Sequence, residues 1–249
     1  MFGEHFYHKQ IRNTVIAFGT IFNNVNIKRL DSSGNPIQTL RVPLSYAPKE
    51  KFLARLDAQQ DLTGDDSKVA ITLPRMSFEV TGYSYDGGRK LNKNQKITKV
   101  TTNADTTKMN NQYMPVPYNV NFSLSVYVAN SDDGLQIVEQ ILPYFQPDYT
   151  VTMIEDRTMD TKRDIPFVLN NVDYEDSYTG SLTTSRRIIY TLSFTAKIYL
   201  YGPISTNAII KTVSADLYSD TGANSPRVER VTVTPNPTSA DKDDTYTYT

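Results

Sequence analysis

The amino-acid sequence predicts a mixed α+β (α/β) fold, in which two or three helices cover a mostly antiparallel, twisted sheet within a single domain. Three observations predict this class. Long segments alternate apolar and polar residues, other segments carry apolar residues at helical spacing, and the composition is rich in Thr, Ser, Asn and Tyr but lacks Trp. Alternation with a period of two is typical of strands with one buried face, and helices interleaved with such strands indicate a sheet covered by helices.

Hydrophobic periodicity sets the order of the expected elements. They are a helix over 4–22, strands over 25–30 and 37–44, a helix from Pro48, strands over 76–81 and 119–128, a helix over 131–145, and strands over 149–154, 165–174, 188–200, 209–217 and 228–233. The first two strands are joined by residues 31–36, whose Gly, Asn and Pro supply turn geometry.

The helices follow from apolar spacing and from residues at their ends. Pro48 suits the first turn of the second helix. Ser131 is the expected N-cap of the third helix, with Asp132 and Asp133 at the positive end of its dipole. The apolar stripes are expected to be Ile11, Val15, Phe18 and Phe22 in the first helix and Leu135, Val138, Ile141, Leu142 and Phe145 in the third.

The strand over 188–200 shows the cleanest alternation. Thr191, Ser193, Thr195 and Lys197 occupy one face. The opposite face is apolar and consists of Ile188, Tyr190, Leu192, Phe194, Ala196, Ile198 and Leu200. We expect the apolar face to pack on the core, while the polar face meets water or a partner.

The domain is expected to span residues 1–218. Within it, residues 86–113 are rich in Asn, Lys, Thr and Gly and have little periodic apolar content, which predicts a long basic loop. Residues 219–249 consist largely of Ser, Thr, Asp and Pro, apart from the short strand at 228–233. This composition predicts a flexible C-terminal tail.

The composition excludes several classes of protein. The chain has 249 residues, 26 basic and 27 acidic side chains, two His and no Cys. Without Cys there are no disulfides, thiolate nucleophiles or Cys-ligated metals. The near-neutral charge gives no signal for specific nucleic-acid binding or for a membrane surface, and no apolar run approaches the ~18 residues of a membrane span.

Histidine and paired carboxylates are the remaining candidates for catalysis. His5 and His8 are expected on the polar face of the first helix, where one adjacent carboxylate, Glu4, makes a weak metal-ligand set. The acidic pairs fall in expected loops, the tail or a helix start, and they are Asp65/Asp66, Asp132/Asp133, Asp173/Glu175/Asp176 and Asp243/Asp244. We therefore expect no catalytic residues, no cofactor and no metal site.

The candidate partner-binding residues are basic and aromatic. Five cations lie between Asp86 and Asp105 with no acid among them, and these are Arg89, Lys90, Lys93, Lys96 and Lys99. Such a segment suits solvated chain or an acidic protein surface better than nucleic acid, because no aromatic residue interleaves with the charges. Tyr199 and Tyr201 at the end of the last long strand suit a subunit interface, where Tyr is enriched, or plain sheet packing.

Several sequence blocks, collinear over about 1–205, are candidates for a family signature. They comprise MFG at 1–3, IKR at 27–29, RVPLSYAPKEKF at 41–52, LPRMSF at 73–78 before YSY at 83–85, QIVEQILPYFQP at 136–147, and SRR at 185–187. Together these blocks resemble the tail sheath stabilisers, or tail terminators, of T4-like contractile-tailed bacteriophages. A twelve-residue block such as 136–147 is far more specific than a short motif.

The resemblance implies a structural virion protein of the tail–neck junction. Such a terminator is expected to form a homohexameric ring that caps the tail tube and contractile sheath. Its implied partners are the tail sheath protein, the tail tube or tube-terminator protein, and the neck or head-completion proteins, with assembly in the host cytoplasm. Two alternatives remain from the residues alone. One is a β-rich receptor- or carbohydrate-binding tail module without a capping role, and the other is a tail-associated hydrolase.

Overall fold

The computed structural model describes residues 5–31, 33, 35–58, 73–100, 108–156, 159, 161–177, 187–221, 226–238 and 247–248. The chain forms two compact units. The large unit consists of residues 7–90 and 116–200, and the small unit of residues 1–6, 91–115 and 201–249. Strands predominate over helices in both, which agrees with the predicted α+β class.

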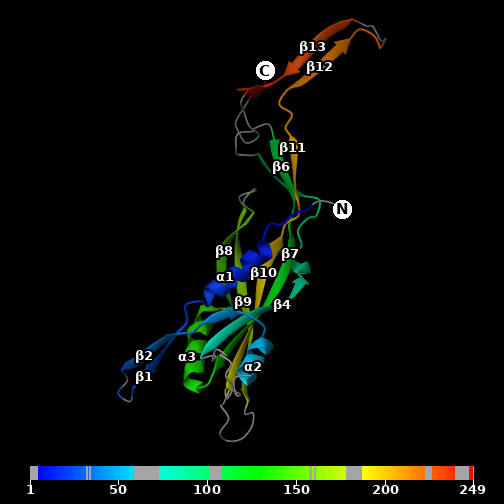
Figure 1. Cartoon of the computed structure of the whole chain (residues 1–249). Helices are drawn as coiled ribbons and strands as arrows, with labels where there is room; N and C mark the ends of the chain where they lie inside the picture. The colour runs from blue at the N-terminus through cyan, green and yellow to red at the C-terminus, as the bar shows by residue number, and fades with distance from the viewer. Residues whose placement is uncertain are drawn as a thin grey trace, which may run out of the picture. The chain divides into compact units, whose positions relative to one another are not determined.

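The large unit is built on a six-stranded sheet in the order β3-β4-β7-β10-β9-β8 (Figure 1). Of these pairings only β3–β4 is parallel. The elements of this unit are α1 Gln10–Ile21, β1 Asn26–Leu30, β2 Pro36–Arg41, β3 Leu44–Tyr46, α2 Lys49–Ala58, β4 Arg75–Tyr85, the 3-10 turn η2 Gly87–Arg89, β7 Val116–Val128, α3 Ser131–Ile141, the 3-10 turn η3 Leu142–Tyr144, β8 Asp148–Asp156, β9 Thr161–Ser177 and β10 Arg187–Leu200.

The alternation predicted for 188–200 is confirmed in β10. Its even-numbered residues from Ile188 to Ile198 are buried, whereas the interleaved residues from Thr191 onward are half-exposed. On the polar face, Asn170 donates to the Thr195 hydroxyl at 2.7 Å, and that hydroxyl donates to Asn121 Oδ1 at 3.1 Å. The polar face is therefore held by side-chain hydrogen bonds across neighbouring strands.

Phenylalanine fills the core between α1 and the sheet. Phe18 of α1 is fully buried and stacks on Phe122 of β7 with ring centroids 4.4 Å apart. It also meets Phe78, Phe167 and Phe194 at 5.3, 5.9 and 5.3 Å. Offset and edge contacts of this kind add to the burial of apolar area.

Helix α1 begins later than the sequence predicts. It starts at Gln10 rather than Glu4, and the exposed His5 and half-exposed His8 precede it. The backbone of Lys9 has φ 60°, a left-handed conformation that an L-residue helix cannot continue through. The expectation that both histidines lie on the polar face of this helix is therefore wrong.

Helix α3 packs on the same sheet face as α1, and the predicted stripe is confirmed for Val138, Ile141 and Phe145 but not for Leu135 and Leu142. Ile137, Val138 and Ile141 are buried, whereas Leu135 and Leu142 are exposed. The N-cap is Asn130, not Ser131, because the Asn130 side chain accepts from the backbone N–H of Asp132. The predicted stripe was rotated because it did not include Gly134, which is buried against the sheet.

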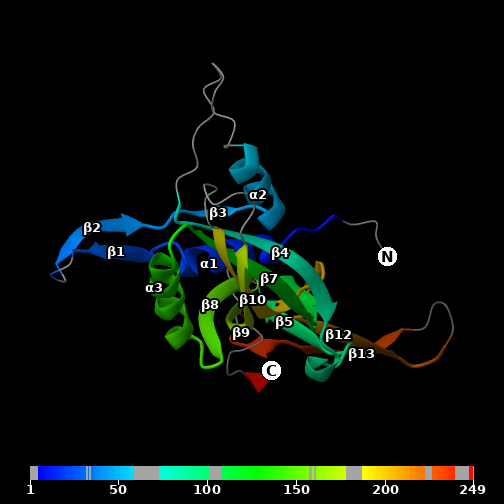
Figure 2. The same cartoon turned by 90° about the horizontal axis from the view of Figure 1, so that it is seen from below.

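The β1–β2 hairpin lies beside α3 (Figures 1 and 2), and two glutamines of α3 bind its backbone. Gln136 accepts from the Lys28 N–H at 3.0 Å and donates to the Lys28 carbonyl at 3.1 Å, as a neighbouring strand would. Gln140 donates to the Asn26 carbonyl at 2.8 Å. An ion pair of 2.9 Å between Arg29 and the buried Asp133 raises the pKa of the Arg29 guanidinium.

Helix α2 packs against the other sheet face. Phe52 is buried and stacks on Tyr127, with ring centroids 5.4 Å apart. The Tyr127 hydroxyl lies 3.1 Å from Ser77 Oγ, and burial raises the pKa of this phenol. This second, smaller apolar cluster also contains Ile189.

The small unit contains the strands predicted over 209–217 and 228–233, with shifted ends, and further strands where a loop and a tail were predicted. Its elements are β5 Lys96–Val100, β6 Lys108–Tyr113, β11 Ile204–Ala208, β12 Val213–Tyr218, β13 Arg227–Val233, β14 Pro235–Asn236 and β15 Thr247–Tyr248. A three-stranded sheet has the order β11-β6-β5, and β12–β13 and β14–β15 form antiparallel pairs. The expected loop over 86–113 is thus wrong in part, because polar β5 and β6 give no alternation by which a strand could be recognised.

The buried side chains on the central strand of this three-stranded sheet are polar. Asn110, Asn111 and Gln112 of its central strand β6 are buried. Thr206 donates to Asn110 Oδ1 at 2.9 Å, Thr98 donates to Asn111 Oδ1 at 3.0 Å, and Gln112 donates to the Gly202 carbonyl at 2.9 Å. Hydrogen bonds between side-chain amides and hydroxyls here take the place that apolar contacts have in the large unit.

Candidate partner-binding surfaces

Arg89 is a structural residue of the large unit. Its guanidinium pairs with Asp86 at 2.8 Å and donates to the Tyr118 carbonyl at 3.2 Å and to Asn119 Oδ1 at 2.8 Å. The hydrogen bond from Arg89 lowers the pKa of the Asp86 carboxyl. The charge of Arg89 is therefore compensated within the chain, whereas the sequence suggested a cation available to a partner.

Tyr199 lies within reach of two guanidinium groups. Arg89 is 5.0 Å and Arg163 is 4.2 Å from the centroid of its ring. Arg163 in turn pairs with the buried carboxylate of Glu155 at 3.1 Å. Cation–π contacts on this ring thus link η2, β9 and β10, and Tyr199 is only half-exposed.

The other predicted residues do not form one continuous patch. Lys90, Lys93 and Lys96 are exposed, and the Lys96 ammonium lies 4.7 Å from the ring centroid of Tyr113. Lys99 is half-buried and, three residues after Lys96 in the same strand, points to the opposite face of the sheet.

Tyr201 is 3% exposed, so the expectation that it presents an aromatic surface to a partner is wrong. The strand β10 ends at Leu200, and the alternation that placed Tyr201 on the polar face does not extend past that residue.

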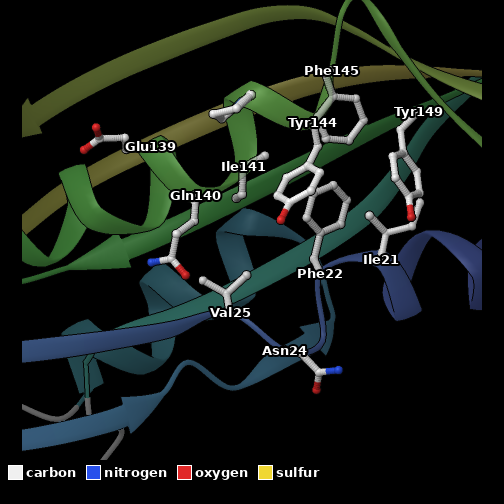
Figure 3. A pocket seen from close by; sticks show the side chains of 11 residues that line it. Ile21, Phe22, Asn24, Val25, Glu139, Gln140, Ile141, Tyr144, Phe145 and Tyr149 are labelled. Atoms are coloured by element: carbon white, nitrogen blue, oxygen red, sulfur yellow. The ribbon is translucent and has the colours of Figure 1, made fainter.

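A groove in the large unit has a volume of about 580 Å³ (Figure 3). We call it the aromatic groove. It is lined by Ile21, Phe22, Asn24, Val25, Glu139, Gln140, Ile141, Pro143, Tyr144, Phe145 and Tyr149. Figure 3 shows the rings of Phe22, Tyr144 and Phe145 together, with Tyr149 beside Ile21. The groove therefore joins the end of α1 to the end of α3 and the start of β8.

The outer face of α3 continues this surface. Asp132, Leu135, Glu139 and Leu142 recur at helical spacing and are all exposed. We call these four residues the acidic stripe. Leu135 and Leu142 were expected in the buried stripe of this helix, so the exposed apolar and acidic face of α3 was not predicted.

The β12–β13 hairpin of the small unit is amphipathic. Strand register places Val213 opposite Val233 and Ala215 opposite Val231. Val213, Leu217 and Val231 are 56%, 52% and 44% exposed. On the other face Arg230 forms a bidentate pair with Asp216 at 2.6 and 2.8 Å, which lowers the pKa of that carboxyl.

The acidic pairs of the sequence do not form a metal centre in the described part of the chain. No group of three or more His, Asp or Glu side chains there could hold an ion. Asp133 pairs with Arg29, and Glu175 pairs with Lys49 at 2.8 Å. Asp65, Asp66, Asp243 and Asp244 lie outside the described residues. None of the helices described is both long and apolar enough to cross a membrane.

Comparison with known proteins gives two consistent matches. A family described as the tail sheath stabiliser of T4-like Myoviridae viruses matches residues 5–249. The match extends beyond residue 205, where the resemblance of the individual sequence blocks ends. The chain is also 34% identical, over 227 residues, to the tail completion protein gp15 of Enterobacteria phage T4, covering 89% of this chain and 81% of that protein.

Proposed function

The chain belongs to the tail sheath stabiliser family of T4-like phages, and from this premise we propose that six copies form a ring that caps the finished tail. As a member of that family it is a structural protein of the virion tail. The ring would cover the last discs of tail tube and contractile sheath, hold the sheath in its extended state, and offer a docking surface to the neck proteins. Assembly would take place in the host cytoplasm.

The observation that best supports assembly is the contrast in burial between the two units. Among the described residues, all members of the two apolar clusters belong to the large unit. The small unit buries amides of β6 and exposes aliphatic residues of the β12–β13 hairpin. An isolated two-stranded hairpin is marginally stable in water, so contact with neighbouring subunits would supply the missing burial.

A terminator of this kind acts by shape and needs no catalytic step. One face of the ring would be complementary to the last tube and sheath subunits, and the other would differ from them, so that addition of further subunits stops. Contacts between two different surfaces of neighbouring copies can close into a ring of six. We accordingly assign no catalytic residue, cofactor or metal to the chain.

The exposed lysines contribute to attachment in this proposal. Lys90, Lys93 and Lys96 would bind an acidic protein surface, whereas Arg89 is engaged with Asp86. An exposed ion pair contributes only about 0.2 to 1 kcal/mol, but six copies would act together through avidity. Replacing the three lysines with Gln should weaken capping of tails and leave the thermal unfolding curve unchanged. If capping depended neither on this change nor on salt concentration, the three lysines would be ordinary solvent-exposed residues with no role in attachment.

The ring itself is tested by sedimentation and by complementation of tails. The wild-type chain, alone or bound to tails, should form a species of six times its own mass. Tails made without it should have unstable sheaths and should fail to join heads. A chain that stays monomeric even on tails would favour the β-rich binding module, and turnover abolished by one carboxylate substitution would favour the hydrolase.

A further inference from the structure

We propose that the acidic surface bound by the exposed lysines lies on a second copy of the same chain, in the aromatic groove and the acidic stripe. This inference rests on the proposed ring, because it names the partner of those lysines within it. Two different surfaces would meet at each subunit boundary, namely the segment around Lys93 and Lys96 on one copy and the outer face of α3 on the next.

Charge complementarity is the first argument. Between Asn130 and Asp156 the sequence has six carboxylates and no Lys, Arg or His. Of these, Asp133 and Glu155 are neutralised by Arg29 and Arg163, whereas Asp132, Glu139 and Asp148 are exposed. Asp148 directly precedes Tyr149, a lining residue of the aromatic groove. The α3 and β8 side of the groove is thus acidic, whereas on the opposite side Arg41 donates to Asn24 Oδ1 at 3.1 Å.

The opposite charge dominates the other surface. From Arg89 to Lys108 the sequence has six cations, and Asp105 is its one acid. Lys93 and Lys96 are exposed there, so their ammonium groups are available to carboxylates of a neighbouring molecule. Like charges would oppose any pairing of this segment with itself, which makes the acidic groove the complementary surface on the same chain.

Apolar complementarity is the second argument. Leu91 and Tyr113 near these lysines are 36% and 54% exposed, and Lys96 lies over the Tyr113 ring. On the acidic side Leu135 and Tyr144 are 56% and 69% exposed beside the groove. Exposed aromatic and leucine side chains among charges of one sign are therefore present on both surfaces. Interfaces commonly combine an apolar centre with such a charged rim.

The pairing is heterologous, since each copy uses two different surfaces. Interfaces of this type form closed rings when the rotation between copies closes, and open stacks when it does not. Reversing the charge of one surface should therefore have a specific consequence: a variant cannot associate with itself, but it can associate with a variant in which the other surface is reversed.

Two charge-reversal variants test this arrangement. The first carries Lys93→Glu with Lys96→Glu, and the second carries Glu139→Lys with Asp148→Lys. Each alone should sediment as a monomer at a concentration where the wild type assembles. A one-to-one mixture should recover the wild-type mass, because the reversed lysine segment of one variant then meets the reversed groove of the other, and the unreversed surfaces meet likewise.

Matched controls separate this effect from loss of folding. Lys51→Glu with Lys162→Glu makes the same change of charge at exposed lysines of α2 and β9, outside both surfaces, and should assemble as the wild type does. Circular dichroism and thermal unfolding of every variant should match the wild type. Recovery of assembly in the mixture is itself a proof of folding, because misfolded chains cannot restore one another.

Cross-linking identifies the contact directly, since the chain has no native Cys. Lys96→Cys and Glu139→Cys proteins, mixed under oxidising conditions on capped tails or in solution, should give a covalent dimer that neither protein gives alone.

Three outcomes would overturn the inference and leave the proposed capping function standing. They are charge-reversal variants that still form rings, a mixture of the two variants that remains monomeric, and intact rings that give no mixed dimer. Reversal variants that form rings but fail to attach to tails would show instead that the lysines bind a sheath or neck protein. Failure of the wild-type chain to form rings even on tails would overturn the proposed function as well.

Discussion

At the scale of single residues, several positions are fixed by close packing or by compensated charge. Gly134 of α3 faces β7 and β10 so closely that an added Cβ would lie 2.6 Å from Tyr190 Cε2 and 3.0 Å from Val128 Cγ2. Gly19 of α1 has a milder version of the same constraint, with Phe78 at 3.0 Å. Both glycines lie within helices, where Ala would otherwise be favoured by about 1 kcal/mol.

We predict that Gly134→Ala destabilises the protein despite its better helix propensity. Overpacking of a close-packed interior costs about 1–3 kcal/mol, which exceeds the gain in propensity. Chemical denaturation monitored by circular dichroism would measure the change. Gly82→Ala is the matched control, since an added Cβ at Gly82 meets no atom within 4 Å. Equal stability of the two variants would show that α3 can move away from the sheet at no cost.

The candidate binding residues show why charge in a sequence does not identify a docking surface. Arg89 carries the same formal charge as Lys93, yet Asp86 three residues earlier forms an ion pair with it. Tyr201 is as aromatic as Tyr113 but is buried. The Asp86–Arg89 pair is local and is therefore visible in the sequence, whereas the burial of Tyr201 depends on tertiary neighbours, which the order of residues does not show.

At the scale of elements, alternating strands could be predicted and the polar strands could not. The period of two in 188–200 determined which face of β10 packs on the main core, because one register alone puts most of its apolar residues on that side. β6 buries Asn and Gln through hydrogen bonds, one of them from Thr98 of β5, so the sequence of this region resembles a loop. The boundary of α1 was missed because Lys9, a residue with no strong preference for φ above zero, interrupts the helix.

The attachment of the β1–β2 hairpin to α3 gives a prediction about an element. Gln136→Leu removes both hydrogen bonds to the Lys28 backbone, and we expect a loss of about 1 kcal/mol in local stability. Hydrogen exchange at the Lys28 amide should therefore become several times faster. Leu135→Gln, one residue away on the exposed face, should leave that exchange unchanged. Unaltered protection in the Gln136 variant would mean that α3 does not hold this hairpin.

At the scale of the whole molecule, the apolar core belongs to the large unit, whereas the proposed assembly surfaces are shared between the two units. The apolar clusters are confined to the large unit, whereas the exposed aliphatic hairpin and the exposed lysines Lys93 and Lys96 belong to the small unit. Mutations should divide in the same way. Substitutions in the Phe core should lower the yield of folded protein, and substitutions in the small unit should lower assembly of protein that is otherwise folded.

Deletion of residues 235–249 tests this division. The deletion removes β14 and β15 but no member of either apolar cluster, so we expect an unchanged main thermal transition. Differential scanning calorimetry provides the measurement. Val138→Asp is the contrasting variant, because it places a charge at a buried position of α3 and should cost several kcal/mol. A large fall in Tm on deletion would show that the C-terminal residues support the core.

The hairpin β12–β13 also has a consequence for the life of the protein before it joins a particle. Newly made copies carry an aliphatic ribbon with two open strand edges, the type of surface that promotes precipitation. Asp216 and Arg230 on the reverse face, together with the neighbouring Arg227, place charges along that ribbon and act as gatekeepers against edge-to-edge stacking. Asp216, Arg227 and Arg230 would thus keep the free subunit in solution until it joins a particle.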